Sequence, residues 1–349
     1  MKGSGQKMKV KFYVGSYAPS EETSIYLYEL DTEKGSLNRI DAVKGVDNPS
    51  YLLVHPNGMI LYAVEELTPD GRLAVFSKNN TLKHICSIES LGADPCHLSL
   101  DEKGEFLFVS NYTSGSLSVY QLDENGSVIK CTDHKQHEGH GTDPERQEGP
   151  HVHFSGMVDQ ELLVCDLGMN CIVRYQLDRK TGTLEEKNER IYFHDGFGPR
   201  HFAVHESHPN HIYVIGELTG EVAVWKEIGA SYQLIQVIDS LPEGYQGENT
   251  AAAIKFDEEG SLLFVSNRGS DSITSFRVSD DGHLEKLSTC ASGGKGPRDF
   301  EIFGKTLVVA NQYTDNLAVL QVENATGKMK ILSEDEKNFK PVMIQKYIK

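Results

Sequence analysis

An all-β fold, a seven-bladed β-propeller, is predicted by three features of this sequence of 349 residues. A unit of strand-like runs recurs along the chain, turns rich in glycine and polar residues separate the runs, and the two ends supply complementary parts of one further unit. Alternating apolar and polar residues between Gly, Asn and Asp turns indicate antiparallel hairpins. Because a repeat of this length is typical of four-stranded blades, it decides the fold class.

Six complete units follow one another along the chain. They align on Pro49, Pro95, Pro150, Pro199, Thr250 and Pro297. The unit that begins at Gly92 shows the pattern in full: a short strand after Pro95, the run FLFVSN, the alternating run LSVYQLD, and a last strand that ends near Cys131. The aligned positions lie 46 to 55 residues apart, which leaves room for four strands and their turns in every unit.

The two ends of the chain predict a seventh unit. Residues 11–43 contain the runs KFYVGSY, SIYLYELD and SLNRIDAV, which match the second, third and fourth strands of a unit that lacks a first. Residues 340–348, KPVMIQKYI, match a first strand alone, with Pro341 in the aligned position. Pairing of these ends in one blade would close the ring and leave no exposed sheet edge.

One domain over residues 1–349 is therefore expected, with two departures from the repeat. Residues 130–149 form a polar excursion between the second and third complete units. Its histidines, His134, His137 and His140, lie in a glycine-bearing stretch without a helical pattern, which predicts a mobile loop or lid and not a metal site. We expect residues 1–8 to lie outside the ring, either as a disordered end or as an addition to a natural chain that begins at Met8.

Composition narrows the classes of function. The formal net charge of −17 disfavours nucleic acid or an anionic membrane as partner, because both require a basic surface. No run approaches the roughly 20 apolar residues that span a bilayer, and the first residues show no apolar leader segment. The six cysteines form no CxxC pair, so we expect reduced thiols and a cytoplasmic location.

Charged and polar residues gather at one position of the repeat. The first strand of a propeller blade lines the channel and the second runs antiparallel beside it, so Arg200 and Glu217 are expected at the same mouth of the channel. The corresponding positions elsewhere are Tyr51 with Glu65, His97 with Asn111, His151 and His153 with Asp166, Ala251 with Asn267 and Arg268, Arg298 and Asp299 with Asn311, and Tyr13 to Tyr17 in the split unit. This rim predicts a polar funnel for a small anionic molecule, although an Arg200–Glu217 pair could also be a purely structural ion pair.

At these residues the chain resembles the lactonase family of seven-bladed propellers, which includes bacterial 6-phosphogluconolactonases of the cycloisomerase type and fungal carboxy-muconate lactonizing enzymes. The motifs are GPHVH at 149–153, GPRH at 198–201, YVIGEL at 213–218 and VSNRG at 265–269. The resemblance covers essentially the whole chain. It implies a lactone substrate with an anionic group, a reaction without cofactor, and a site formed by Glu217, Arg200, Arg268 and either His151 or His153. His151 is favoured because it follows its proline directly, as Arg200 does.

Hydrolysis of 6-phosphoglucono-δ-lactone, a step of the pentose phosphate route, is the function that this resemblance favours. We expect Glu217 or His151 to act as general base, Arg200 or Arg268 to stabilise the oxyanion, and the other arginine, with Arg298, to bind the phosphate. The further expected substrate-binding residues are His153, His97, Asn267, Glu65, Asn111, Asn311 and Asp166. No metal is expected. A lactonase or cycloisomerase for a carboxylated or other sugar lactone, and a non-catalytic propeller scaffold, are the alternatives, and the oligomeric state is left open.

Overall fold

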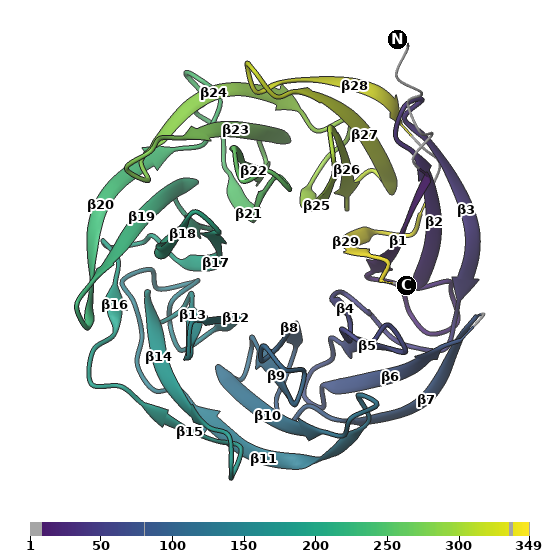
Figure 1. Cartoon of the computed structure of the whole chain (residues 1–349), viewed down its shortest axis with the longest axis vertical. Helices are drawn as coiled ribbons and strands as arrows, with labels where there is room; N and C mark the ends of the chain where they lie inside the picture. The colour runs from purple at the N-terminus through teal and green to yellow at the C-terminus, as the bar shows by residue number, and fades with distance from the viewer. Residues whose placement is uncertain (1–8, 80, 335–337, 349) are drawn as a thin grey trace.

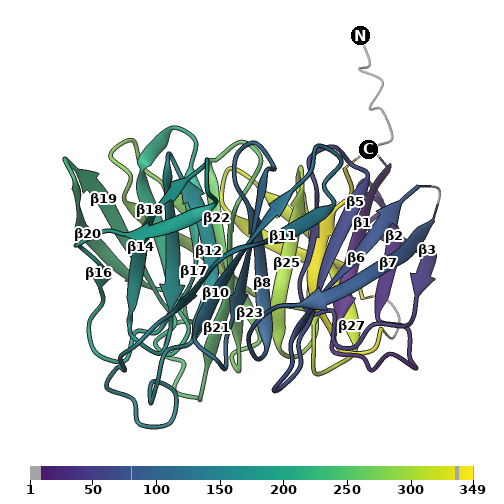
Figure 2. The ribbon, with the colours of Figure 1, turned by 90° about the horizontal axis from the view of Figure 1, so that it is seen from below.

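The computed structural model describes residues 9–79, 81–334 and 338–348, and every regular element in this part of the chain is a β-strand. Seven sheets stand around a central channel (Figure 1), and Figure 2 shows the same ring edge-on as a squat cylinder. The predicted seven-bladed propeller is thus confirmed. The expectation for residues 1–8 falls outside the described residues.

The blades are numbered here in chain order. Blade 1 contains β29 (Pro341–Lys346), β1 (Lys9–Ser16), β2 (Ile25–Asp31) and β3 (Ser36–Val43). Blade 2 contains β4 (Leu52–Val54), β5 (Ile60–Glu65), β6 (Arg72–Lys78) and β7 (Leu82–Glu89). Blade 3 contains β8 (Pro95–Leu100), β9 (Phe106–Asn111), β10 (Ser116–Leu122) and β11 (Val128–Gln136). Blade 4 contains β12 (Val152–Val158), β13 (Glu161–Asp166), β14 (Cys171–Asp178), β15 (Thr183–Glu186) and β16 (Ile191–Tyr192).

The other three blades each have four strands. Blade 5 contains β17 (Pro199–His205), β18 (His208–Gly216), β19 (Glu221–Ile228) and β20 (Ser231–Asp239). Blade 6 contains β21 (Thr250–Phe256), β22 (Leu262–Arg268), β23 (Ser272–Val278) and β24 (Leu284–Ala291). Blade 7 contains β25 (Pro297–Phe303), β26 (Thr306–Asn311), β27 (Asn316–Glu323) and β28 (Lys328–Glu334). Since β11 runs to Gln136, the predicted polar excursion is shorter than expected, and we call residues 137–149 the inter-blade loop.

Blade 1 closes the ring by pairing the two ends of the chain. Strand β1 runs antiparallel to β29, with Val14 opposite Ile344, and β2 and β3 complete the sheet. The sheet order β29-β1-β2-β3 places the strand that comes last in the sequence innermost. The predicted closure by N- and C-terminal strands is therefore confirmed.

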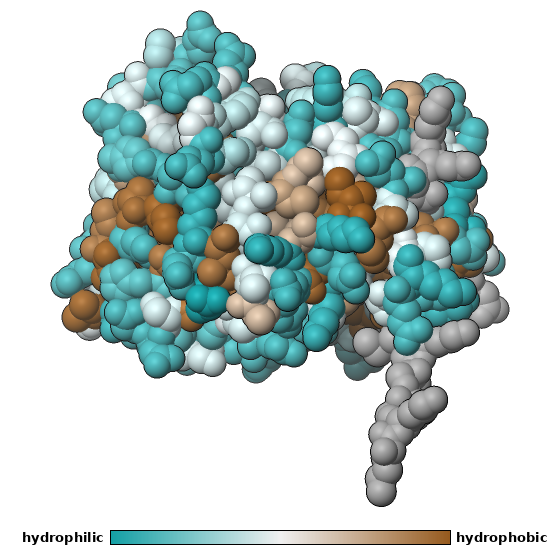
Figure 3. All heavy atoms as spheres, turned by 90° about the horizontal axis from the view of Figure 1, so that it is seen from above, coloured by the Kyte–Doolittle hydropathy of each residue, from teal (hydrophilic) through white to brown (hydrophobic). Residues whose placement is uncertain are grey.

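The core consists of seven apolar clusters, each shared by two neighbouring blades. One cluster joins Phe12 and Ile344 of blade 1 to Val308 of blade 7, and the other six occupy the remaining blade interfaces. The perimeter is mostly polar, with apolar side chains scattered among the polar ones (Figure 3). No helix among the described residues is long and apolar enough to cross a membrane. All six cysteines are free thiols.

A β-bulge recurs at the start of the innermost strand in six blades. Pairing with the second strand skips one residue in β8, β12, β17, β25 and β29 and two residues in β21. The skipped residues are Cys96, His153, Arg200, Arg298, Val342, and the pair Ala252–Ala253. A bulge residue leaves the ladder and its side chain is re-aimed, so one end of the channel receives one such side chain from each of these blades.

Because β29 closes the ring, a cavity left by one of its buried side chains should markedly lower the free energy of unfolding. Ile344 is fully buried, so Ile344→Ala should lower the free energy of unfolding by about 2–5 kcal/mol. Ile40→Ala on the perimeter strand β3, where the side chain is 43% exposed, is the matched control and should change stability far less. Urea denaturation measures both variants. Equal small effects would show that β29 does not seal the ring.

Candidate active site

The mouth of the channel gathers the bulge side chains of five blades. The bulge residues Cys96, Arg200, Arg298 and Val342 line one cavity there, together with Met343 of β29. The bulge in β12 falls on His153, because Val152 pairs with Asp166 as Pro199 pairs with Gly216. His153 is thus the structural counterpart of Arg200. The sequence alignment on Pro150, which favoured His151, was displaced by two residues.

The centre of this mouth is the buried carboxylate of Glu217, which binds three arginines. Arg200 donates from Nε to Oε2 at 2.9 Å, and Nη2 of Arg268 forms an ion pair with the same oxygen at 2.9 Å. Arg146 donates from Nη2 to Oε1 at 2.6 Å. The side chains of Glu217, Arg200 and Arg268 are each less than a tenth exposed. The structure therefore brings together the three charged residues expected from the sequence and adds a fourth.

The charges of this group decide the protonation state of Glu217. Burial alone would raise the pKa of its carboxyl group, but Arg268 and Arg200 hold the pKa well below the usual range. Glu217 is therefore an ionised carboxylate at neutral pH and a weak base. Burial and the neighbouring Arg268 lower the pKa of Arg200 to about 10, which leaves its guanidinium charged at neutral pH.

Backbone carbonyls of β21 fix the orientation of the two buried arginines. Arg200 donates from Nη1 to the carbonyl of Ala252 at 2.9 Å, and Arg268 donates to the carbonyls of Thr250 and Ala251 at 3.2 and 2.9 Å. Ala252 lies in the bulge of β21, where pairing with β22 is interrupted, and Thr250 and Ala251 come directly before it. Both guanidinium groups are therefore held rigidly.

A second carboxylate, Glu66, lies at the same mouth beside Arg298. Tyr17 donates its hydroxyl to both oxygens of Glu66 at 2.8 and 2.9 Å, and the hydroxyl of Ser50 makes a further short hydrogen bond. The guanidinium of Arg298 lies 5.0 Å from the centre of the Tyr17 ring. Within the described part of the chain this guanidinium makes no hydrogen bond, so its five donors remain available.

Three neutral imidazoles line the wall next to the arginines. Burial and the charge of Arg200 hold the pKa values of His97, His153 and His201 well below the usual value. The ring of His201 lies 5.2 Å from that of His153 and 5.7 Å from that of His97. The Nδ1 atom of His153 is buried without a hydrogen-bond partner in the described residues. His153 thus presents an uncommitted imidazole nitrogen.

His151 lies to one side of this group. Its ring stacks on Tyr112 at 4.5 Å, its Nδ1 lies 3.1 Å from the carbonyl oxygen of Tyr112, and its Nε2 lies 3.2 Å from Glu148. These contacts occupy both ring nitrogens. The expected choice of His151 over His153 is not what the geometry favours.

Five of the expected substrate-binding residues instead make hydrogen bonds within the scaffold. Asn111, Asn267 and Asn311 donate to the carbonyls of Ser90, Ser240 and Ser292, each of which follows the last strand of the preceding blade. Asp166 accepts hydrogen bonds from the backbone N–H groups of His151 and Met169 and from His137. Glu65 accepts one from Ser87. These polar side chains are committed to the scaffold, and the structure does not bring them to the funnel.

The scaffold residues just described, such as Glu65 and Asn267, lie at the end of the second strand of their blades. The next residue along the chain is the one that faces the funnel. Glu217, Glu66 and Arg268 each come one residue after Gly216, Glu65 and Asn267. The sequence contains a signal for Glu66, because YVIGEL and YAVEEL align with Glu217 opposite Glu66. Arg146 lies outside the repeat, and no spacing rule could have found it.

The three histidines of the predicted lid separate from one another. His134 belongs to β11 and contacts Ser118, while His140 is exposed. His137 is buried, with Nδ1 2.7 Å from Asp166 and Nε2 3.0 Å from the hydroxyl of Tyr175. His137 therefore anchors the inter-blade loop. Among the described residues, no group of three or more His, Cys, Asp and Glu side chains could hold a metal ion.

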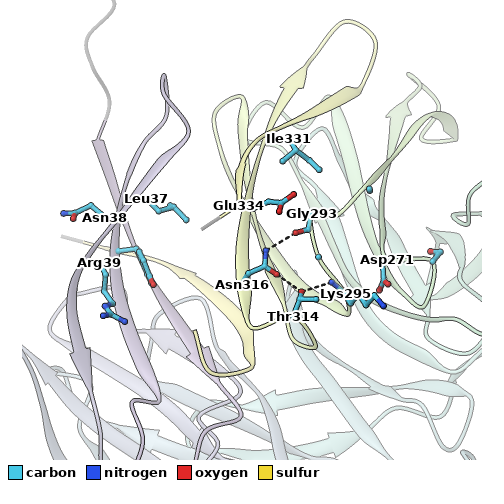
Figure 4. Close-up of a pocket in the computed structure, with 14 residues that line it drawn as sticks. Leu37, Asn38, Arg39, Asp271, Gly293, Lys295, Thr314, Asn316, Ile331 and Glu334 are labelled. Carbon is cyan, nitrogen blue, oxygen red and sulfur yellow. Dashed lines mark hydrogen bonds between the residues drawn. The ribbon is translucent and has the colours of Figure 1, made fainter. Parts of the chain in front are cut away.

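A wider cleft lies on the perimeter, away from the arginines that surround Glu217. Leu37, Asn38 and Arg39 of β3 form one side of it, and Asn316 and Glu334 of blade 7 form the other (Figure 4). It is open to solvent, and none of the residues that surround Glu217 lines it. The chemistry of the chain therefore concentrates at the channel mouth and not in this larger cleft.

The ion group around Glu217 predicts an unusual sensitivity to loss of one charge. Glu217→Gln would leave three guanidinium groups without their shared carboxylate, so the free energy of unfolding should fall by about 3–5 kcal/mol. Added inorganic phosphate should restore part of the loss by replacing the missing negative charge. Glu285→Gln, which removes an exposed partner of Arg277, is the control and should cost about 0–1 kcal/mol. Equal losses in urea denaturation would contradict this arrangement.

The sequence and the fold of this chain are similar to those of known proteins. The family model described as "Lactonase, 7-bladed beta-propeller" matches residues 11–346. A 6-phosphogluconolactonase of Bacillus subtilis is 32% identical over 331 residues, which cover 92% of this chain and 93% of that protein. A protein of the same name from Formosa agariphila is 31% identical over 338 residues, covering 93% and 95%. The structure of a periplasmic gluconolactonase from Pseudomonas aeruginosa superposes with a TM-score of 0.91 at 26% identity, covering 98% and 99%. The chain belongs to the lactonase family of seven-bladed β-propellers.

Proposed function

We propose that this protein hydrolyses 6-phosphoglucono-δ-lactone to 6-phosphogluconate, a step of the pentose phosphate route, in the cytoplasm. One observation carries the proposal. We define the mouth cluster as Arg146, Arg200, Arg268, Arg298, Glu66 and Glu217. Its four guanidinium groups face two carboxyl groups, which leaves an excess of at least two positive charges, because burial raises the pKa of Glu66 and protonation of that carboxyl group only enlarges the excess. A phosphate monoester dianion supplies that charge. The names of the relatives from Bacillus subtilis and Formosa agariphila support the same substrate.

The reaction begins with attack of water on the lactone carbonyl carbon. We assign the general base to His153, because its imidazole is neutral and its Nδ1 is uncommitted. Two contacts support this choice over the bases expected from the sequence: the arginines keep Glu217 a weak base, and Glu148 and the Tyr112 carbonyl occupy His151. His153 takes the proton of the water as its oxygen binds the carbonyl carbon.

The tetrahedral oxyanion that forms requires positive charge already in place. Arg200 and Arg268 are buried, charged and held by the carbonyls of β21, so they need no reorganisation during the reaction. Collapse of the oxyanion breaks the bond between the carbonyl carbon and the ring oxygen. The His153 imidazolium then returns its proton to that oxygen, which leaves as the hydroxyl of the open-chain acid. Arg298, with its free donors, binds the phosphate.

The substrate is tested by turnover of three lactones with spontaneous hydrolysis subtracted. We expect the highest kcat/KM with 6-phosphoglucono-δ-lactone, a lower value with glucono-δ-lactone, and the lowest with a muconolactone. Preference for glucono-δ-lactone would favour the activity named for the Pseudomonas aeruginosa neighbour, and preference for muconolactone would favour a carboxylated substrate. Absence of turnover with all three would favour a binding protein.

The general base is tested by His153→Asn. Loss of the base should lower kcat by about 10²- to 10⁴-fold. His151→Asn removes an imidazole from the same strand end and should produce a much smaller fall. Circular dichroism establishes that both variants fold. A larger loss in the His151 variant would return the assignment to the expectation from the sequence.

The pH profile of the wild-type enzyme gives an independent reading of the same assignment. Because burial and Arg200 lower the pKa of His153, the imidazole stays unprotonated and active as pH falls through the ordinary histidine value of about 6.5. We therefore expect kcat/KM to stay level between pH 7.5 and 6, with the decline at lower pH. An inflection near pH 6.5 would contradict this prediction.

A further inference from the structure

Arg146 reaches the mouth cluster from outside the repeat. It lies in the inter-blade loop, which follows β11 of blade 3 and projects from the lower face in Figure 2, opposite the end where the C-terminus lies. The loop crosses blade 4, and Arg146 places its guanidinium on Glu217, which follows β18 of blade 5. An arginine has therefore been supplied to the site by a segment that the propeller fold does not require.

The base of the loop is built to hold this side chain in place. Asp143 accepts hydrogen bonds from the backbone N–H groups of Glu145 and Arg146. The fully buried Gln147 donates to the carbonyl of Leu167 and the side chain of Asn170 in blade 4, and accepts from the N–H groups of Thr142 and Asp143. His137 anchors the start of the loop on Asp166. A loop that is only solvated would not need this many hydrogen bonds, so we infer that they fix the position of Arg146.

Unlike the two buried arginines, Arg146 keeps donors free at the entrance. Its Nη2 donates to Glu217 at 2.6 Å and lies 3.4 Å from the hydroxyl of Tyr112, while its Nε and Nη1 make no hydrogen bond within the described residues. Its side chain is 38% exposed, against 3% for Arg200 and 8% for Arg268. Glu217 already has two other arginines. Arg146 is thus the most accessible cation of the group that surrounds Glu217.

We propose that Arg146 is a specificity residue that binds the phosphate of an incoming phosphorylated lactone and so selects it over neutral lactones. This inference rests on the proposed function and adds how the site recognises its substrate. Glu217 holds the guanidinium in position in the free enzyme, so little side-chain freedom is lost when the phosphate binds. Two forked guanidinium groups, Arg146 and Arg298, then face one dianion. A neutral sugar lactone gains nothing from either group.

The selectivity is tested by comparing Arg146→Ala with the wild type on two substrates that differ only in the phosphate. We expect kcat/KM for 6-phosphoglucono-δ-lactone to fall about 10- to 100-fold, chiefly through a higher KM, because a charge-assisted hydrogen bond is lost. The kcat/KM for glucono-δ-lactone should fall far less, so that the preference for the phosphorylated lactone drops. Arg146→Lys keeps the charge without the fork and should give an intermediate KM for the phosphorylated substrate.

Arg277→Ala is the matched control. Arg277 is also an accessible arginine on a single glutamate, with its Nη1 2.8 Å from Glu285 and 46% of its side chain exposed, but it lies on β23 away from the mouth. This variant should match the wild type on both substrates. Equal losses of Arg146→Ala on both lactones would mean that Arg146 only positions Glu217, and no loss on either would mean that it touches no substrate; both results overturn the proposal.

Binding of the hydrolysis products separates this proposal from the proposed function. Calorimetric titration with 6-phosphogluconate and gluconate does not depend on turnover. Weaker binding of 6-phosphogluconate alone by Arg146→Ala supports the phosphate contact, and unchanged binding overturns it. Whether the wild-type enzyme turns over the phosphorylated lactone at all is the separate test of the proposed function.

Discussion

The shared carboxylate of Glu217 is the interaction on which the site depends. Three guanidinium groups from three separate parts of the chain, Arg146, Arg200 and Arg268, would repel one another in a buried space without it. Removal of charges from water is costly, and only close pairing and further hydrogen bonds offset that cost. The carbonyls of β21 and the hydroxyl of Tyr112 supply those bonds. A positive excess remains after this pairing.

The fold could be predicted because the repeat is a property of the sequence alone. Runs of alternating residues at a steady spacing, with matching fragments at the two ends, leave a closed ring of seven blades as the consistent solution. The pairing of Arg200 with Glu217 followed from the same geometry, since antiparallel strands bring the start of one beside the end of the next. Partners that are distant in sequence could thus be predicted wherever regular hairpins bring them together.

The site was harder to predict where the backbone departs from regular pairing. The bulge in β12 falls on His153 and not on the residue after the proline, and no residue pattern announces a bulge of that kind. A shift of one position likewise decides between Glu65, which serves the scaffold, and Glu66, which faces Arg298. Arg146 belongs to a loop that does not follow the repeat, so the position of its side chain depends on tertiary contacts such as those of Gln147.

The closure of the ring has a consequence for how activity arises during synthesis. Val342 and Met343 of β29 line the same cavity as Arg200 and Arg298, yet β29 leaves the ribosome after every other strand. A nascent chain with six finished blades would therefore hold its arginines around an open, hydrated gap, where their attraction for anions is weak. Substrate-binding ability should appear late and abruptly, and a ligand that occupies the finished mouth would in turn resist the detachment of that final strand.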